Sequence, residues 1–567
     1  SPGANCHAQD LRDAPAPLRL DPPASQSDLC GACLASFSGM ENFEDLVALC
    51  EDRCRRHADR PLFGEKVDGA WTWTTYEAFG HLVDDLRGGL RGLGVAPGDR
   101  VAIVSRNRTA WAVAAYATYG LGATFVPMYE AQNPEEWRFI LSDCGARVVL
   151  GSGERVTSAL AGMQPRLPEL AHVIAIDGDG PGLTYQTLLA RGRERGVPAV
   201  HPGGDAIAGF VYTSGTTGRP KGAILSHRNL VSNVTAAIEV FPIAPEDRSL
   251  SFLPWAHVYG QVCELHILLA AGASTAFNQR LESLPADLVE VRPTLLVAVP
   301  RIFNKIHDGV RTQIAGKPGL IQRLFRAGLR HAQRRAAGEA LGPIEALELR
   351  LADRLIFAKV RARFGGRLRY AISASAALSR EVAEFVDALG IPVYEGYGLT
   401  ETSPVVATNR PGARKMGTVG RPIPGVTVKI DERLGPEPGV GEIVVFGPNV
   451  MVGYHHRPEE NARAIDSDGG LRTGDLGFLD SDGYLHISGR IKEQYKLENG
   501  KYVMPTPLEE QLALSPYIAN VMLHGANRPF NVALVVLDVG AVRAWAEGQG
   551  AELGAAPAAR PAVRALI

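Results

Sequence analysis

The chain has 567 residues, which is more than one hydrophobic core usually supports, so two or more domains are expected. Hydrophobic residues at 46% and charged residues at 21% are typical of a folded soluble protein, and a formal net charge of −2 excludes a protein attracted as a whole to nucleic acid or to an anionic membrane. Seven cysteines in so long a chain form no disulfide framework, which favours the reducing cytoplasm as its location.

Residues 1–39 are rich in Ala, Pro, Ser and Asp and show no periodicity. They are predicted to be disordered, or to be a non-native extension before a natural start at Met40. From there helical patterns alternate with short apolar runs, such as 101–104, 147–150 and 173–176. This alternation predicts βαβ units and parallel sheets.

The longest charge-free stretch, residues 110–129, has the length of a membrane-spanning helix. Gly120, Gly122 and Pro127 interrupt it, and its second half has the residues of a β-strand. We therefore expect a buried helix followed by a core strand.

The first chemical motif lies at residues 211–222. An apolar run leads into a loop made almost wholly of hydroxyl residues and glycines, Lys221 closes the loop, and a second apolar run follows. Glycines let backbone N–H groups converge on an anion, and the lysine adds a point charge. The pattern predicts a polyphosphate site between two strands. Because Gly222 and a strand follow the lysine, it is not a Walker P-loop.

Two further motifs follow downstream. In residues 394–401, Tyr397 stands between two glycines, where its ring can stack on a base, and Glu401 offers the hard oxygen that Mg²⁺ prefers. In the stretches 472–477 and 489–493, Asp475 can accept both hydroxyl groups of a ribose, and Arg490 adds a charged donor. Taken singly, such motifs are also found as tight turns and surface residues.

These three motifs, in this order, resemble the acyl-adenylate-forming (AMP-binding) superfamily over roughly residues 42–545. The resemblance implies an α/β fold. A large N-terminal domain of doubly wound sheets with a small β-barrel subdomain would cover 40–490, and a hinge and partial, mobile α+β C-terminal domain would cover 491–567. Lys492 would lie at the hinge, which lets the small domain rotate between two half-reactions.

The resemblance also implies roles for particular residues. Four would be catalytic: Lys221, Thr400, Glu401 and His257, the last of which orients the acid rather than acting as a nucleophile. Contacts with ATP or CoA would come from a larger set: Thr213, Ser214, Gly215, Thr216, Thr217, Gly218, Ser375, Tyr397, Asp475, Arg490 and Lys496. Mg²⁺ would be held by Thr216 and Glu401. Relatives usually have two glycines where Ala374 and Ser375 stand, which weakens the expected backbone contact with adenine.

Residues 301–369 form an Arg-rich helical region with 16 Lys or Arg against 5 Asp or Glu. Such a region is either a solvated helical face or a basic surface that meets acyl-CoA phosphates or an anionic bilayer. In the second case the protein would be peripheral to the inner face of the membrane. The long helical segment, and the sequence from Lys496 to Pro505, resemble the long-chain fatty acyl-CoA synthetase branch.

The expected activity is therefore the ATP-dependent conversion of a long-chain fatty acid to acyl-AMP and then acyl-CoA, with release of pyrophosphate and AMP. Two alternatives stay open: a fatty acyl-AMP ligase that loads a carrier protein, and a relative that binds nucleotide and acyl chain without catalysis. The family's late C-terminal lysine has no counterpart before Ile567. The sequence is therefore expected to be truncated within the small domain, or the protein to be a defective member.

Overall fold

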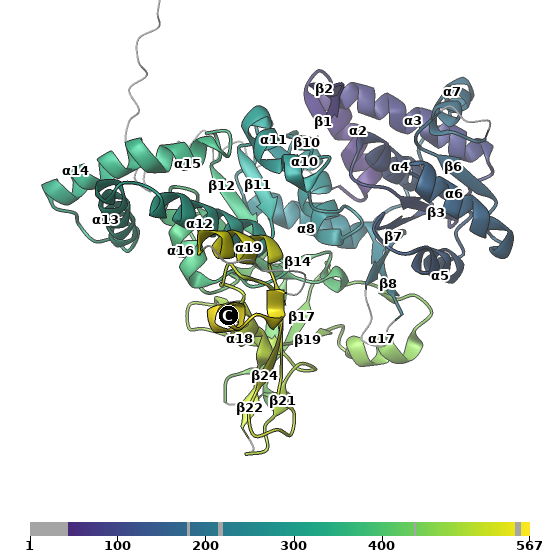
Figure 1. Cartoon of the computed structure of the whole chain (residues 1–567). Helices are drawn as coiled ribbons and strands as arrows, with labels where there is room; N and C mark the ends of the chain where they lie inside the picture. Colours follow the sequence, from purple (N-terminus) through teal and green to yellow (C-terminus); the bar gives the residue numbers. More distant parts are fainter. Residues whose placement is uncertain (1–42, 179–181, 214–218, 436–437, 500, 550–556) are drawn as a thin grey trace, which may run out of the picture. The chain divides into compact units, whose positions relative to one another are not determined.

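The computed structural model describes residues 43–178, 182–213, 219–435, 438–499, 501–549 and 557–567 (Figure 1). The predicted extension at residues 1–39 lies outside the described residues. The first segment described is α2, and the predicted alternation of helices and strands follows from it.

The first sheet has seven strands in the order β18-β8-β7-β4-β3-β5-β6. The pairs from β7 to β6 are parallel, whereas β8 pairs antiparallel with both β7 and β18. The strands are β3 (Arg100–Val104), β4 (Thr124–Met128), β5 (Val148–Gly151), β6 (His172–Ala175), β7 (Ile207–Thr213), β8 (Lys221–Ser226) and β18 (Gly453–Tyr454). The three apolar runs predicted as strands are thus β3, β5 and β6.

Two further sheets adjoin at their edges. One has the order β2-β1-β10-β9 and the other β11-β12-β13-β14-β15, and the backbone N–H of Thr294, before β11, donates to the carbonyl of Arg248 at the start of β9. The strands are β1 (Pro61–Val67), β2 (Ala70–Thr75), β9 (Arg248–Ser251), β10 (Ser274–Phe277), β11 (Leu295–Ala298), β12 (Tyr370–Ser373), β13 (Val393–Gly398), β14 (Val405–Thr408) and β15 (Arg421–Pro422).

The helices between these strands cover the sheets. They are α2 (Leu46–Arg56), α3 (Tyr76–Gly92), α4 (Thr109–Tyr119), α5 (Pro134–Cys144), α6 (Glu154–Met163), α7 (Tyr185–Arg195), α8 (His227–Val240), α9 (Val258–Gly260), the π-helix η2 (Gln261–His266), α10 (Ile267–Ala270), α11 (Leu284–Val291) and α16 (Arg380–Ala388). Every residue of α4 is buried, and β4 follows it. The charge-free stretch is therefore a core helix and a core strand, as predicted. Among the described residues no helix is long and apolar enough to cross a membrane.

The Arg-rich region is helical, as predicted. It consists of α12 (Pro300–Ala315), α13 (Gly319–Ala336), α14 (Pro343–Ala352), the π-helix η4 (Asp353–Phe357) and α15 (Ala358–Ala362). Gly328 of α13 allows the close approach of the next helix, because a Cβ there would overlap the methyl group of Ala352 in α14. The two helices pack against each other along this line (Figure 1).

A four-stranded antiparallel sheet, β16-β17-β19-β20, lies in the part of the chain before residue 490, and the β-barrel subdomain stays a prediction. Its strands are β16 (Thr427–Asp431), β17 (Gly441–Phe446), β19 (Leu471–Leu479) and β20 (Leu485–Arg490), with α17 (Pro458–Ala464) before β19. After it come β21 (Tyr495–Lys496), β22 (Tyr502–Val503), α18 (Pro505–Leu512), β23 (Ile518–His524), β24 (Val532–Leu537), α19 (Val539–Gly548) and α20 (Pro561–Leu566). The predicted mixed α/β fold class is confirmed, and the domain boundary at residue 490 stays a prediction.

Candidate active site

The phosphate-binding motif lies on the hairpin of β7 and β8, where Thr213 pairs with Lys221 across the mouth of the loop. Ser214, Gly215, Thr216, Thr217 and Gly218 lie outside the described residues, so their predicted contacts with phosphate and Mg²⁺ stay predictions. The amine of Lys221 forms an ion pair with the carboxylate of Glu460 in α17. It also lies 5.6 Å from the centre of the Tyr454 ring. Lys221 is thus half-buried between an acidic and an aromatic side chain.

Glu401 lies on a short 3₁₀ helix, Thr400–Thr402, that follows β13. Its Oε1 accepts a hydrogen bond of 2.6 Å from the hydroxyl of Tyr454. Because Tyr454 is in β18 and pairs with Ala223 of β8, this bond links Glu401 to the strand that begins with Lys221. Thr400, beside it, is buried.

Glu401 is the carboxylate of the sequence motif that a divalent cation would bind here. Among the residues that the structure describes, no three His, Cys, Asp or Glu side chains gather in a way that could hold a metal ion. Mg²⁺ commonly takes only one or two protein carboxylates and completes its shell with water and substrate phosphate oxygens. Glu401 fits that kind of binding, and the group would supply positive charge beside the phosphates.

Tyr397, Asp475 and Arg490 form one hydrogen-bonded cluster. The Tyr397 hydroxyl donates to Oδ2 of Asp475 over 2.6 Å, and Nε of Arg490 lies 2.9 Å from Oδ1. Asp475 is 3% exposed, and burial raises its pKa, whereas the bonds from Tyr397 and Arg490 oppose the shift. Each carboxylate oxygen keeps a second lone pair, so Asp475 can still accept hydroxyl groups from a ligand.

The glycine after Tyr397 is required by a close approach of the backbone. A Cβ at Gly398 would overlap the carbonyl oxygen of Pro404, which lies next to the following strand β14. Because only glycine fits, β13 can pair with β14 directly behind Tyr397. This packing holds the tyrosine where its hydroxyl reaches Asp475.

His257 is the N-cap residue of α9. Its Nδ1 accepts the backbone N–H of Tyr259 over 3.1 Å, and burial lowers the pKa of the imidazole. The neutral ring therefore carries its proton on Nε2, the nitrogen not bonded to the backbone. His257 can donate one hydrogen bond to a ligand from that atom.

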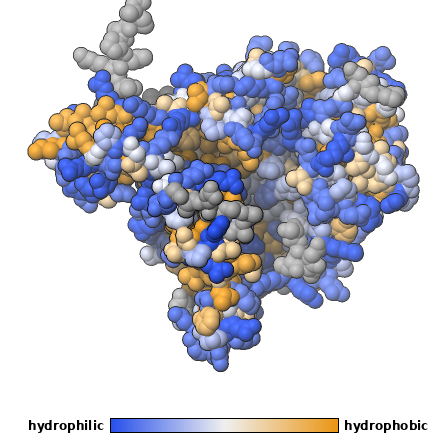
Figure 2. Space-filling model, viewed as in Figure 1, coloured by the Kyte–Doolittle hydropathy of each residue, from blue (hydrophilic) through white to orange (hydrophobic). Residues whose placement is uncertain are grey.

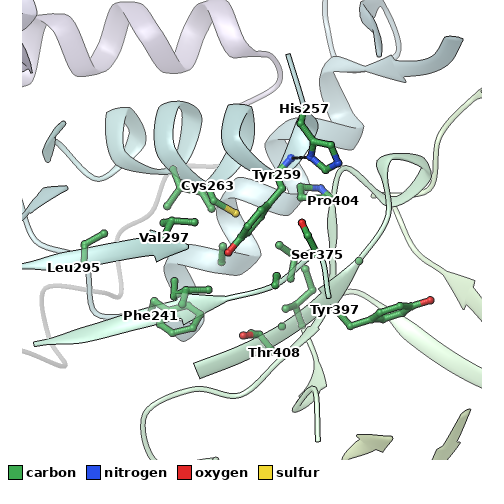
Figure 3. A pocket seen from close by; sticks show the side chains of 18 of the residues that line it. Phe241, His257, Tyr259, Cys263, Leu295, Val297, Ser375, Tyr397, Pro404 and Thr408 are labelled. Atoms are coloured by element: carbon green, nitrogen blue, oxygen red, sulfur yellow. Dashed lines mark hydrogen bonds between the residues drawn. The ribbon is translucent and has the colours of Figure 1, made fainter. Parts of the chain in front are cut away.

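A largely apolar cavity that opens to solvent lies beside His257, and about 770 Å³ in and around it, open solvent included, is not filled by protein atoms. His257, Ser375 and the backbone around Tyr397 line one part of it. In Figure 3 the Tyr397 ring points away from the cavity, while Phe241 and Leu295 lie on the side opposite His257. The other lining residues are mostly aliphatic or aromatic and include Ala237, Ile243, Tyr259, Cys263, Ile267, Leu268, Val297, Ile372 and Val405. Such a lining suits an apolar ligand.

The family of the chain follows from its sequence similarity to known proteins. The sequence profile of the AMP-binding enzyme family matches residues 50–455. The chain belongs to the AMP-binding enzyme family. The match spans the phosphate motif, Tyr397, Glu401 and the whole lining of the cavity, and it confirms the predicted superfamily.

Proteins similar to this AMP-binding enzyme are named ligases. Long-chain-fatty-acid–CoA ligase FadD15 of Mycobacterium bovis is 32% identical over 527 residues, which is 90% of this chain and 85% of that protein. Human long-chain-fatty-acid–CoA ligase 1 is 32% identical over 87% of this chain and 73% of its own. Among solved structures, ATP-bound MatB from Rhodopseudomonas palustris is similar with a TM-score of 0.69 and 26% identity, over 88% of this chain and 89% of that one.

Ser375, at the edge of the cavity, has an unusual backbone conformation. Its φ of +73° is in the left-handed region, which glycine adopts freely and residues with a Cβ do not. The serine therefore holds a strained backbone at the edge of the cavity. The left-handed conformation costs an L-residue roughly 1–2 kcal/mol.

We expect Ser375→Gly to stabilise the protein by roughly 0.5–1 kcal/mol, because relief of the strain outweighs the greater freedom of glycine in the unfolded chain. The midpoint of urea unfolding measures the effect. The neighbouring Ala376→Gly is the matched control and is expected to destabilise, since no positive φ is recorded at Ala376. If both variants shift the midpoint in the same direction, backbone strain at Ser375 is not the cause.

One predicted contact residue, Lys496, lies apart from the others, and two residues near the phosphate motif were not predicted. Lys496 is in β21 with its amine 5.0 Å from the centre of the Tyr502 ring, and no recorded contact brings it to the cluster around Asp475, so its role stays a prediction. The sequence reasoning did not identify Tyr454 or Glu460. Both come close to the phosphate motif because β18 pairs with β8, which is more than 200 residues earlier in the chain. No local pattern signals that pairing.

Proposed function

We propose that the chain activates a long-chain fatty acid with ATP and then transfers the acyl group to CoA. The observation that carries this proposal is the apolar cavity beside His257 and Tyr397, because it puts space for a hydrocarbon chain next to the residues of the nucleotide motifs. The names of the similar ligases support the same substrate class. ATP binding by the similar MatB supports the nucleotide.

In the first step an oxygen of the fatty carboxylate forms a bond to the α-phosphorus of ATP, and the bond between that phosphorus and the bridging oxygen breaks, releasing pyrophosphate. The chain contributes mainly position and charge. His257 donates from Nε2 to the carboxylate and orients it. Lys221 neutralises the phosphates, and Glu401 would hold Mg²⁺.

The nucleoside end is bound by the cluster around Asp475. The carboxylate accepts the ribose hydroxyls, while Tyr397 and Arg490 hold it in place and oppose the rise in its pKa that burial causes. In the second step the thiolate of CoA attacks the acyl carbonyl, a thioester forms, and AMP leaves. The apolar cavity keeps the acyl chain out of water during both steps.

Pyrophosphate release with fatty acids of increasing chain length tests the first step, and thioester formation with CoA or with an acyl carrier protein tests the second. We expect release with long-chain acids and a thioester with CoA. Thioester formation on the carrier alone would assign the chain to the acyl-AMP ligases. ATP binding without any acid-dependent pyrophosphate release would contradict the proposed reaction.

The cavity predicts which residues set chain length. Leu295 and Val297 of β11 face the cavity, while Leu296 between them faces the core. Val297→Phe adds a ring to the space and is expected to lower kcat/KM for long acids by about tenfold relative to medium-chain acids. Leu296→Phe is the control, because it crowds the core without filling the cavity. An unchanged preference in Val297→Phe would show that the acyl chain lies elsewhere.

A further inference from the structure

Asp475 lies in an irregular part of strand β19. The register of the ladder between β17 and β19 shifts between Glu442 and Val444, where one residue of β17 faces three residues of β19. Those three residues, 473–475, form a bulge, and a bulge beside an active site commonly turns a side chain in a new direction. The shape of the bulge therefore decides where the carboxylate of Asp475 points.

The backbone of the bulge forms its hydrogen bonds outside the regular ladder. The N–H of Gly474 donates to Oε1 of Glu442 over 3.1 Å, and the N–H of Asp475 donates to the hydroxyl of Thr473 over 3.1 Å. That hydroxyl donates in turn to the carbonyl of Ile443 over 2.8 Å. Buried N–H groups that leave a ladder need such replacement acceptors. A side chain of the neighbouring strand thus holds the residue directly before Asp475.

Gly474 is the residue at which the bulge turns. Its φ of +73° is in the left-handed region, and its carbonyl accepts the N–H of Ile491 over 2.9 Å. Glu442 bonds the peptide group before Gly474 and Ile491 bonds the peptide group after it, so both sides of the turn are fixed. If Glu442 is removed, the first of these peptide groups loses its acceptor and the turn can rotate.

Arg472 fixes the other oxygen of Glu442. Its Nη1 donates to Oε2 of Glu442 over 2.7 Å, and the same guanidinium also bonds Asp431 and Asp466. Glu442 is 5% exposed, so its carboxylate is shielded from water and depends on its protein partners. Because a charge-assisted bond holds one oxygen, the other is presented in a fixed direction, toward Gly474.

We propose that Glu442 is a positioning residue for ribose recognition, and that its bond to Gly474 holds the bulge in the shape in which the Asp475 carboxylate meets the ribose hydroxyls. This role rests on the proposed function, in which Asp475 binds the ribose. Glu442 acts through Asp475 rather than on the nucleotide. If Glu442 instead only stabilised the sheet through Arg472, its loss would weaken the binding of every nucleotide equally.

Calorimetric titration of the full chain with ATP and with 2′,3′-dideoxy-ATP tests the proposal. The ratio of the two dissociation constants measures ribose recognition and cancels effects that are common to both nucleotides. We expect Glu442→Ala to weaken ATP binding by about tenfold and dideoxy-ATP binding by less than about twofold. Glutamine has one oxygen for the two donors Gly474 and Arg472, so Glu442→Gln is expected to reduce the ratio by about threefold and to stay folded.

A double-mutant cycle with Asp475→Asn shows whether Glu442 acts through Asp475. In the Asp475→Asn variant the carboxylate that Glu442 positions is already absent. Adding Glu442→Ala to it is therefore expected to change the ratio of dissociation constants by less than about twofold. The effect of Glu442→Ala on the ratio should thus be large in the unaltered chain and small in the Asp475→Asn variant.

Two variants in the same part of the chain are the controls. Glu432→Ala removes an exposed glutamate whose Oε2 likewise accepts the N–H of a glycine, that of Gly439 over 3.0 Å. Asp466→Ala removes one carboxylate from Arg472 but leaves the bond from the bulge to Glu442 in place. We expect neither control to change the ratio. Thermal unfolding followed by circular dichroism shows whether each variant is folded.

Three results would overturn the proposal: an unchanged ratio in either folded Glu442 variant, the same change of ratio in Asp466→Ala, or an equal effect of Glu442→Ala with and without the Asp475 carboxylate. The titrations need no fatty acid, so they are independent of the proposed reaction. Pyrophosphate release with a fatty acid is measured beside them. If the unaltered chain prefers ATP to dideoxy-ATP but releases no pyrophosphate, the proposed reaction is wrong and the role of Glu442 is still decided by the ratios.

Discussion

Replacing Glu401 by glutamine is expected to lower kcat for pyrophosphate release by about a hundredfold or more. Glutamine keeps the shape of the side chain but removes the negative charge, and Glu401 is the described carboxylate that would hold Mg²⁺ beside the phosphates. The loss should be larger at low Mg²⁺, so the Mg²⁺ concentration at half-maximal rate should rise. Rates at a series of Mg²⁺ concentrations measure both effects.

Tyr454→Phe is the matched control for this prediction. It removes the 2.6 Å hydrogen bond to Oε1 but leaves the carboxylate in place. We expect a decrease in kcat of less than about tenfold, because only the orientation of Glu401 is affected. If Glu401→Gln shows the same Mg²⁺ dependence as the unaltered chain, Glu401 does not bind the ion.

Replacing Asp475 by asparagine is expected to lower kcat/KM for ATP by about thirtyfold, mainly through KM. The carboxylate is buried and contacts both the Tyr397 hydroxyl and Arg490. Asparagine can replace at most some of these interactions. The readout specific to the ribose is a comparison of ATP with 2′,3′-dideoxy-ATP. The unaltered chain should prefer ATP, and the variant should lose most of this preference.

Asp480→Asn provides the control for the ribose prediction. Asp480 is an aspartate just after the same strand β19, but it accepts from Lys415 and His486. We expect no change in the preference between the two nucleotides. If Asp475→Asn discriminates against the dideoxy nucleotide as well as the unaltered chain does, the ribose is bound by other groups.

The parts of the site that could be predicted are those whose residues lie close together along the chain. The hairpin around the phosphate loop depends on two apolar runs and the glycines between them. Tyr397 and Glu401 come from one short motif. Such patterns act over a few residues and are therefore visible without the fold.

Other parts depend on contacts between distant segments. The bond from Tyr397 to Asp475 joins residues 78 apart, and that from Tyr454 to Glu401 joins residues 53 apart. The cavity is lined from several sheets and helices, so its volume follows from packing and not from any one motif. Figure 2 shows hydrophobic atoms gathered over α14, at the left of the view. In α14 the exposed Leu347 and Leu351 cannot be told from the buried Leu349 by sequence, because exposed and buried apolar residues of a helix recur with the same period.

The ion pair between Lys221 and Glu460 has a consequence for how ATP binding responds to salt. Without nucleotide the charge of Lys221 is already matched by a side chain of the protein. A phosphate that takes this place displaces Glu460 rather than a dissolved counterion. We therefore expect the affinity for ATP to fall less steeply with ionic strength than the number of cationic side chains around the triphosphate would suggest. When Glu460 is replaced by glutamine, this dependence on ionic strength should become steeper.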